Sequence, residues 1–250
     1  MGLGTPDGYN DANQSTRSPG LARIECHSIM GVNHPSGLRT TNLANLAFLG
    51  GLAVTFMTMT HASSTNISSL RRSLLIGGLG FGAASLCVFA TVAFAERWMY
   101  TQLGLYGAYL VWTALFILLG GGVLGSLVVG RWRLPKFYLL FGLAFFAYAV
   151  GWTAAYFVLR GAMGEWIGSL VGSLLMGSVF AVGFGVARSA LTLSAVLFVA
   201  NSIGYFLGSA LNDAIGGPVG MLLWGTAYGV FLGAGLGAVL HLAQTKRTTV

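Results

Sequence analysis

The sequence predicts an all-α integral membrane protein, a bundle of about seven transmembrane helices. Its 250 residues are 55% hydrophobic and only 8% charged, whereas about 25% of the residues of an ordinary soluble domain are charged. Long apolar runs recur from Leu43 to the C-terminal end, and about 20 apolar residues are enough for a helix to cross the hydrocarbon core. The runs are continuous rather than alternating, which favours helices over the strands of a membrane barrel.

Short segments that carry charges and turn-forming residues separate the predicted spans. Pro135 and Pro218 fit the first turn of the helix that follows each of them, where a missing N–H costs no hydrogen bond. Arg188 lies either in a tight turn or inside the membrane, where its charge would be costly and functional; we adopt the turn. The predicted spans are residues 43–61, 73–95, 105–130, 137–159, 166–187, 190–211 and 219–243.

The chain divides into three parts by composition. Residues 1–41 are polar and show no sustained apolar period, so we expect an extended or disordered tail unless it docks on a partner. Residues 42–245 form the predicted transmembrane domain, and residues 246–250 a short basic tail.

Lys and Arg are distributed unevenly between the two sets of loops, which predicts the orientation. The loops on one side hold Arg71, Arg72, Arg131, Arg133, Lys136, Arg188, Lys246 and Arg247. The other side holds Arg39, Arg97 and Arg160 together with Glu96, Glu165 and Asp213. We therefore expect a cytoplasmic C-terminus and an external N-terminus, in a bacterial cytoplasmic membrane or an equivalent energy-transducing membrane. Arg131, Arg133 and Lys136 are the predicted contacts with anionic lipid.

Two spans share a pattern that suggests an internal repeat. Trp112, Gly121, Leu124 and Gly125 match Trp224, Gly233, Leu236 and Gly237 at a constant offset. Such a duplication would give a parallel arrangement of three, one and three spans, as some transporters have. The alternative is a chance likeness between glycine-rich helices.

Glycines at intervals of four predict close helix packing, because removing side chains along one ridge lets two backbones approach. One ridge lies on the last span and a second at residues 164–172. Docking on a second copy or on another subunit is the alternative use of these faces. The predicted ridge of the last span is Gly225, Gly229, Gly233 and Gly237.

Polar and aromatic residues follow one face of two other spans. Asn201 and Tyr205 share a face of residues 190–211, and Tyr148 and Trp152 share a face of residues 137–159. We predict these four residues as contacts for a solute or ligand, the alternative being hydrogen bonds and packing between helices.

The sequence lacks the residues that several kinds of transport and catalysis require. No acidic residue lies at a predicted membrane centre, where coupled pumps place a carboxylate or a histidine relay. The sequence contains no HExxH, GxSxG or P-loop motif. We therefore predict no enzyme, assign no catalytic, metal or cofactor residue, and expect no nucleic-acid partner.

Two functions fit this pattern. The first is an uncoupled permease or facilitator for a small neutral or apolar solute or a lipid. The alternative is a non-catalytic accessory or scaffold subunit of a larger membrane complex. The expected partners are the lipid bilayer and either a second copy of the chain or a larger assembly.

Overall fold

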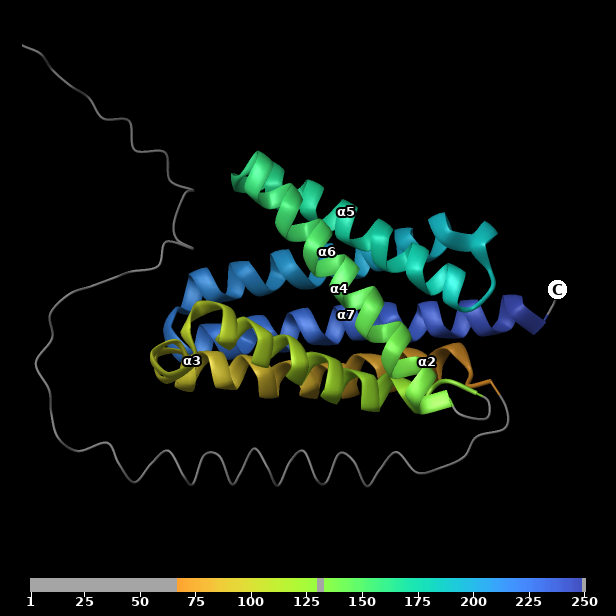
Figure 1. Cartoon of the computed structure of the whole chain (residues 1–250), viewed down its shortest axis with the longest axis horizontal. Coiled ribbons are helices and arrows are strands. Elements are labelled where there is room, and N and C mark those ends of the chain that lie inside the picture. Colours follow the sequence, from red (N-terminus) through yellow and green to blue (C-terminus); the bar gives the residue numbers. More distant parts are fainter. Residues whose placement is uncertain (1–66, 130–132, 249–250) are drawn as a thin grey trace, which may run out of the picture. The chain divides into compact units, whose positions relative to one another are not determined.

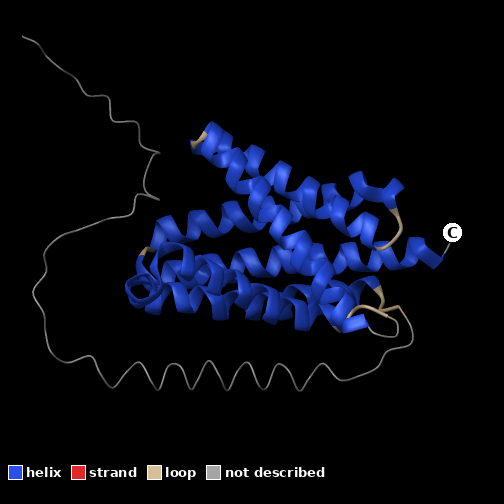
Figure 2. Cartoon of the chain, viewed as in Figure 1, coloured by secondary structure: helices blue, strands red, loops and turns tan. Residues whose placement is uncertain are grey.

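The computed structural model describes residues 67–129 and 133–248, and these residues form helices joined by short turns (Figure 2). No strand occurs among them, and five helices are long and apolar enough to cross a membrane. The all-helical prediction is therefore confirmed for the described part of the chain. The predicted first span, residues 43–61, and the polar tail, residues 1–41, lie outside it.

The helices follow one another in a simple order (Figure 1). The short α2 (Leu70–Leu75) runs through a π-helical turn, η1 (Ile76–Gly80), into α3 (Phe81–Gly125). The next two long helices are α4 (Arg133–Leu159) and α5 (Gly161–Gly183). A 3₁₀ turn, η2 (Ala187–Ser189), leads into α6 (Ala190–Ile215), and α7 (Gly217–Thr248) ends the described chain.

The stretch Leu70–Gly125 is one helical run, where the sequence predicts two spans with a break at Glu96–Arg97. The chain stays helical through this charged pair because Glu and Arg are good helix formers. It bends at Gly104, whose φ of 68° and ψ of 179° are not helical. Phe81 contacts Phe116 across the fold, with ring centroids 6.0 Å apart, so the two arms of α3 pack against each other.

The other turns use glycine and positive backbone angles. Arg160 and Gly161, each with a φ of 54°, join α4 to α5, and Gly216, with a φ of 69°, joins α6 to α7. Arg188 lies in η2 with an exposed side chain, so the structure places it in a turn rather than inside a helix.

The surface of the bundle is apolar along the length of the helices. Every long helix directs large hydrophobic side chains outward, whereas soluble monomeric proteins rarely expose large contiguous apolar patches. Examples from separate helices are Leu79, Phe94, Leu139, Val158, Val182, Leu191 and Val219. Five apolar helices with outward-facing hydrophobic side chains indicate integration in a membrane.

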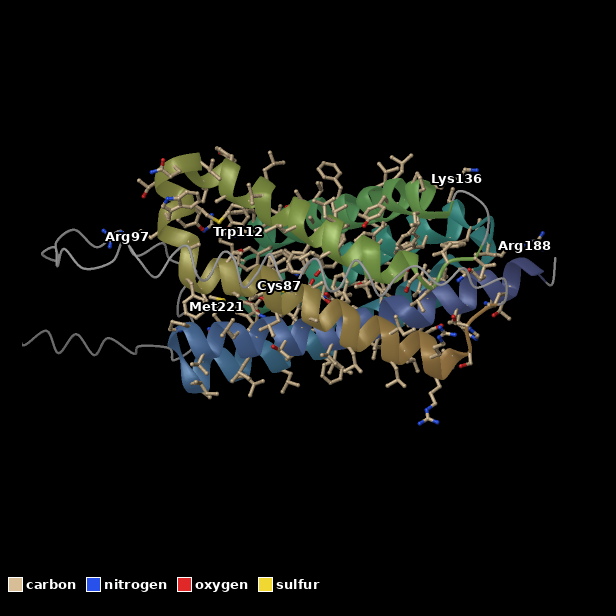
Figure 3. The ribbon with its side chains drawn as sticks, turned by 90° about the horizontal axis from the view of Figure 1, so that it is seen from below. Cys87, Arg97, Trp112, Lys136, Arg188 and Met221 are labelled. Carbon is tan, nitrogen blue, oxygen red and sulfur yellow. The ribbon has the colours of Figure 1, made fainter. Side chains whose placement is uncertain are left out.

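The charged residues gather at the two ends of the bundle (Figure 3). Arg97 lies at one end, and Lys136 and Arg188 lie at the opposite end. The acidic residues of the described chain, Glu96, Glu165 and Asp213, lie close to the turns at the Arg97 end.

The two segments of the suggested repeat have different surroundings. A side chain at Gly121 would meet the ring of Tyr138, whereas one at Gly233 would meet the backbone of Gly77. The matching glycines therefore serve different contacts, and the structure gives the repeat no support.

Candidate functional site

Glycines of α5 provide space for aromatic rings of α4. A Cβ atom at Gly172 would lie 2.8 Å from Cδ2 of Tyr148, and one at Gly168 would lie 3.2 Å from Cδ1 of Trp152. Gly164 faces Tyr156 in the same way. The glycine ridge and the aromatic stripe are thus the two sides of one interface, although they appear as separate patterns in the sequence.

The same arrangement joins α6 to α7. A Cβ atom at Gly204 would lie 3.1 Å from the backbone of Tyr228, and Gly208 faces the indole of Trp224. Both interfaces bring helix axes close together, since no bulky side chain separates them. Their combined effect is to bring hydroxyl and amide groups of four helices within hydrogen-bonding distance.

A continuous hydrogen-bonded network links these four helices. The hydroxyl of Tyr228 donates to the hydroxyl of Tyr148 over 3.3 Å, and Tyr148 donates to Oδ1 of Asn201 over 2.8 Å. Nδ2 of Asn201 donates to Oγ of Ser169 over 2.8 Å. Ser169 and Ser202 share a further hydrogen bond of 2.8 Å. We call these five residues the polar network.

Four of the five residues of the polar network are buried, and the network lies near the middle of each helix. Asn201 and Ser169 have no exposed surface, and Tyr148 and Ser202 are buried. Satisfying these groups matters because an unpaired amide or hydroxyl in hydrocarbon is costly. None of the five side chains is charged, so the network offers neutral donors and acceptors midway along the helices.

An aromatic layer lies next to the network, towards the Arg97 end of the bundle. The rings of Trp152 and Tyr205 are 5.8 Å apart, and Tyr205 contacts Trp224 at 5.9 Å. The hydroxyl of Tyr205 interacts with the carboxylate of Glu165. This layer lies between the acidic end of the bundle and the neutral network.

The structure divides the four predicted contact residues between these two layers. Tyr148 and Asn201 contact each other directly in the polar network, and Trp152 and Tyr205 contact each other in the aromatic layer. The sequence interpretation assigned no role to Ser169 or Tyr228. Each of them is adjacent to a ridge glycine, Gly168 or Gly229, and this position was the available signal that they lie in an interface.

The predicted ridge on α7 packs inside the chain. Gly233 contacts the backbone of Gly77, and Gly237 contacts the backbone of Ser73. Gly225 faces Phe89, and Gly229 faces Ser85 and Gly82. This face of α7 is therefore covered by α2, η1 and α3.

The predicted lipid contacts lie at the start of α4. Lys136 is exposed in the first turn of that helix, and Arg133 is its first residue. Arg131 lies outside the described residues.

No family model, no curated protein and no solved structure matches this chain. Its functional interpretation depends on the geometry described above.

Proposed function

We propose that the protein is an uncoupled permease or facilitator for a small neutral or apolar solute or a lipid. The observation that supports this proposal is the polar network, which places neutral hydroxyl and amide groups of α4, α5, α6 and α7 together at mid-depth. Side-chain hydrogen bonds between membrane helices average only about 0.6 kcal/mol. A solute group can therefore replace one of them at small cost.

The proposed topology has seven crossings, with the N-terminus outside and the C-terminus in the cytoplasm. The 45 residues of α3 would extend about 68 Å as a straight helix, against a hydrocarbon core of about 30 Å. Its two packed arms accordingly count as two crossings, and the first crossing is proposed from the apolar sequence of residues 43–61, which lie outside the described part of the chain. The end that carries Arg71, Arg72, Lys136 and Arg188 faces the cytoplasm in this proposal, as the positive-inside rule requires.

Replacement of Asn201 tests the proposal. Asn201→Leu removes the amide that joins Tyr148 to Ser169, so we expect flux of small solutes into proteoliposomes to fall at least tenfold while the protein still assembles. Thr226→Val is the matched control, because the Thr226 hydroxyl bonds only to Leu222 of its own helix. Equal flux through wild type and Asn201→Leu would refute the proposed path.

A role as an accessory subunit is the second candidate. The observation in its favour is an exposed aromatic group at the bend of α3, where Trp98, Tyr106 and Tyr109 are 60%, 88% and 53% exposed. Aromatic side chains are enriched where proteins meet partners, but also at membrane interfaces. Purification in mild detergent separates the two roles: a stoichiometric complex with other subunits supports the accessory role, and a monodisperse homomer with solute flux excludes it.

A further inference from the structure

Ser173 is a buried hydroxyl without a hydrogen-bond partner. It is 1% exposed, and its Oγ is one of two buried side-chain polar atoms in the described chain that make no hydrogen bond. A buried polar group left unsatisfied destabilises a protein. Its position therefore needs an explanation that the packing of the helices does not supply.

Ser173 lies on the line along which α5 and α6 carry their other buried hydroxyls. One turn of α5 before it, Ser169 bonds to Ser202 of α6. One turn after it, Gly177 contacts Ser194, whose hydroxyl donates to the carbonyl of Leu174 over 3.3 Å. The hydroxyls of Ser169, Ser173 and Ser194 thus follow the seam at steps of about 6 Å.

We infer that the row of buried hydroxyls along the α5–α6 seam binds uncharged solutes that carry hydroxyl or amide groups, and we call this row the binding track. Ser173 supplies the hydroxyl of the track that has no hydrogen-bond partner within the described chain. This inference rests on the proposed function and narrows its substrate class, leaving out apolar solutes and lipids. A small molecule that leaves the polar network finds in Ser173 a hydroxyl with unused donor and acceptor capacity. The side chains of the track that bear hydrogen bonds are neutral serines and an amide, so the track offers an ion no counter-charge.

The first experiment measures glycerol and urea flux into proteoliposomes by light scattering. In the Ser173→Ala variant we expect about a fivefold lower flux, which corresponds to one lost hydrogen bond, and a higher unfolding temperature, since an unsatisfied hydroxyl is removed. Ser178→Ala is the matched control, because Ser178 is a partly buried serine of α5 that lies off this line. A more stable Ser173→Ala variant with wild-type flux overturns the track and leaves the permease proposal intact.

The second experiment does not depend on transport. In a background with Cys26 and Cys87 replaced by alanine, Ser173→Cys is treated with a small neutral thiol reagent, methyl methanethiosulfonate, and with a cationic reagent of the same class. We expect modification by the neutral reagent, protection by glycerol, and no reaction with the cation. Ser85→Cys is the control, because Ser85 is equally buried but hydrogen-bonded to Gly225 in a different interface.

The two readouts distinguish failure of the track from failure of the permease. Glycerol-protected modification without flux refutes the permease and retains the binding track. Absence of modification at Ser173→Cys, or equal modification at Ser85→Cys, overturns the track whether or not the protein conducts solutes.

Discussion

The two faces of α7 form interfaces of opposite character. One face presents glycines to α2, η1 and α3, where Gly233 and Gly237 contact the backbones of Gly77 and Ser73. The other face presents rings to α6 and α4, where Tyr228 bonds to Tyr148 and Trp224 packs on Tyr205. We refer to them as the glycine seam and the ring face.

The glycine seam and the ring face differ in how easily their contacts can rearrange. In the glycine seam, Gly233 and Gly237 meet the backbones of Gly77 and Ser73, so at these two contacts neither partner has a side chain that can rotate away. On the ring face, Gly204 also lies against the backbone of Tyr228, but the groups that stack and form hydrogen bonds are side chains, which can change rotamer when a neighbour is altered. The glycine seam is therefore suited to fix α7 against the α3 hairpin, and the ring face is suited to a site whose hydrogen bonds change partners.

The largest effect is expected in the glycine seam. Gly233→Ala places a methyl group on the carbonyl oxygen of Gly77 and 2.6 Å from Cβ of Phe81, so the helices must separate. Overpacking of a close contact costs about 1–3 kcal/mol, and we expect the upper part of this range in chemical unfolding of the detergent-solubilised protein.

Gly142→Ala is the control for this change. A Cβ atom there meets only Ile117, at 3.9 Å, and alanine favours a helix by about 0.5–1 kcal/mol over glycine, so the variant should be unchanged or slightly more stable. A Gly233→Ala variant as stable as Gly142→Ala would contradict the contrast between the seam and the ring face.

The sequence predicts much of this fold because membrane spans depend on local composition. The positions of α4, α5, α6 and α7 follow from apolar runs, and Pro135 and Pro218 lie in the first turns of α4 and α7 as predicted. The bend of α3 at Gly104 falls between the predicted spans 73–95 and 105–130, but the chain stays helical through Glu96 and Arg97, because charge and apolar content indicate where a membrane ends and not where a helix does. Gly104 ends the first arm through its backbone angles, which composition does not encode.

The candidate site is less predictable because it depends on the pairing of helices. Periodicity places Asn201 and Tyr148 on single faces, yet it does not show that these faces meet. The pairing of Gly172 with Tyr148 and of Gly204 with Tyr228 determines which hydroxyls become neighbours. The sequence likewise does not predict that the Ser173 hydroxyl lacks a hydrogen-bond partner, since this is a property of the packed bundle.

Smaller effects are expected on the ring face, where two variants test whether the Tyr148–Asn201 hydrogen bond contributes more to stability than the Tyr228–Tyr148 bond. Tyr148→Phe removes the donor to Oδ1 of Asn201, a residue with no exposed surface, and leaves a buried acceptor with one bond fewer. We expect a loss of about 1.5 kcal/mol in the free energy of unfolding, measured as for Gly233→Ala. Tyr228→Phe removes only the 3.3 Å bond at the end of the network, and Tyr148 keeps its bond to Asn201.

The expected loss for Tyr228→Phe is about 0.5 kcal/mol, close to the average for side-chain hydrogen bonds between membrane helices. The double variant should lose no more than Tyr148→Phe alone, because the bond of Tyr228 has no acceptor once the Tyr148 hydroxyl is gone. Additive losses would show that the two tyrosines act independently. A larger loss in the free energy of unfolding for Tyr228→Phe than for Tyr148→Phe would contradict the expected ranking of the two hydrogen bonds. Either result would show that the Tyr228 hydroxyl stabilises the ring face independently of its bond to Tyr148.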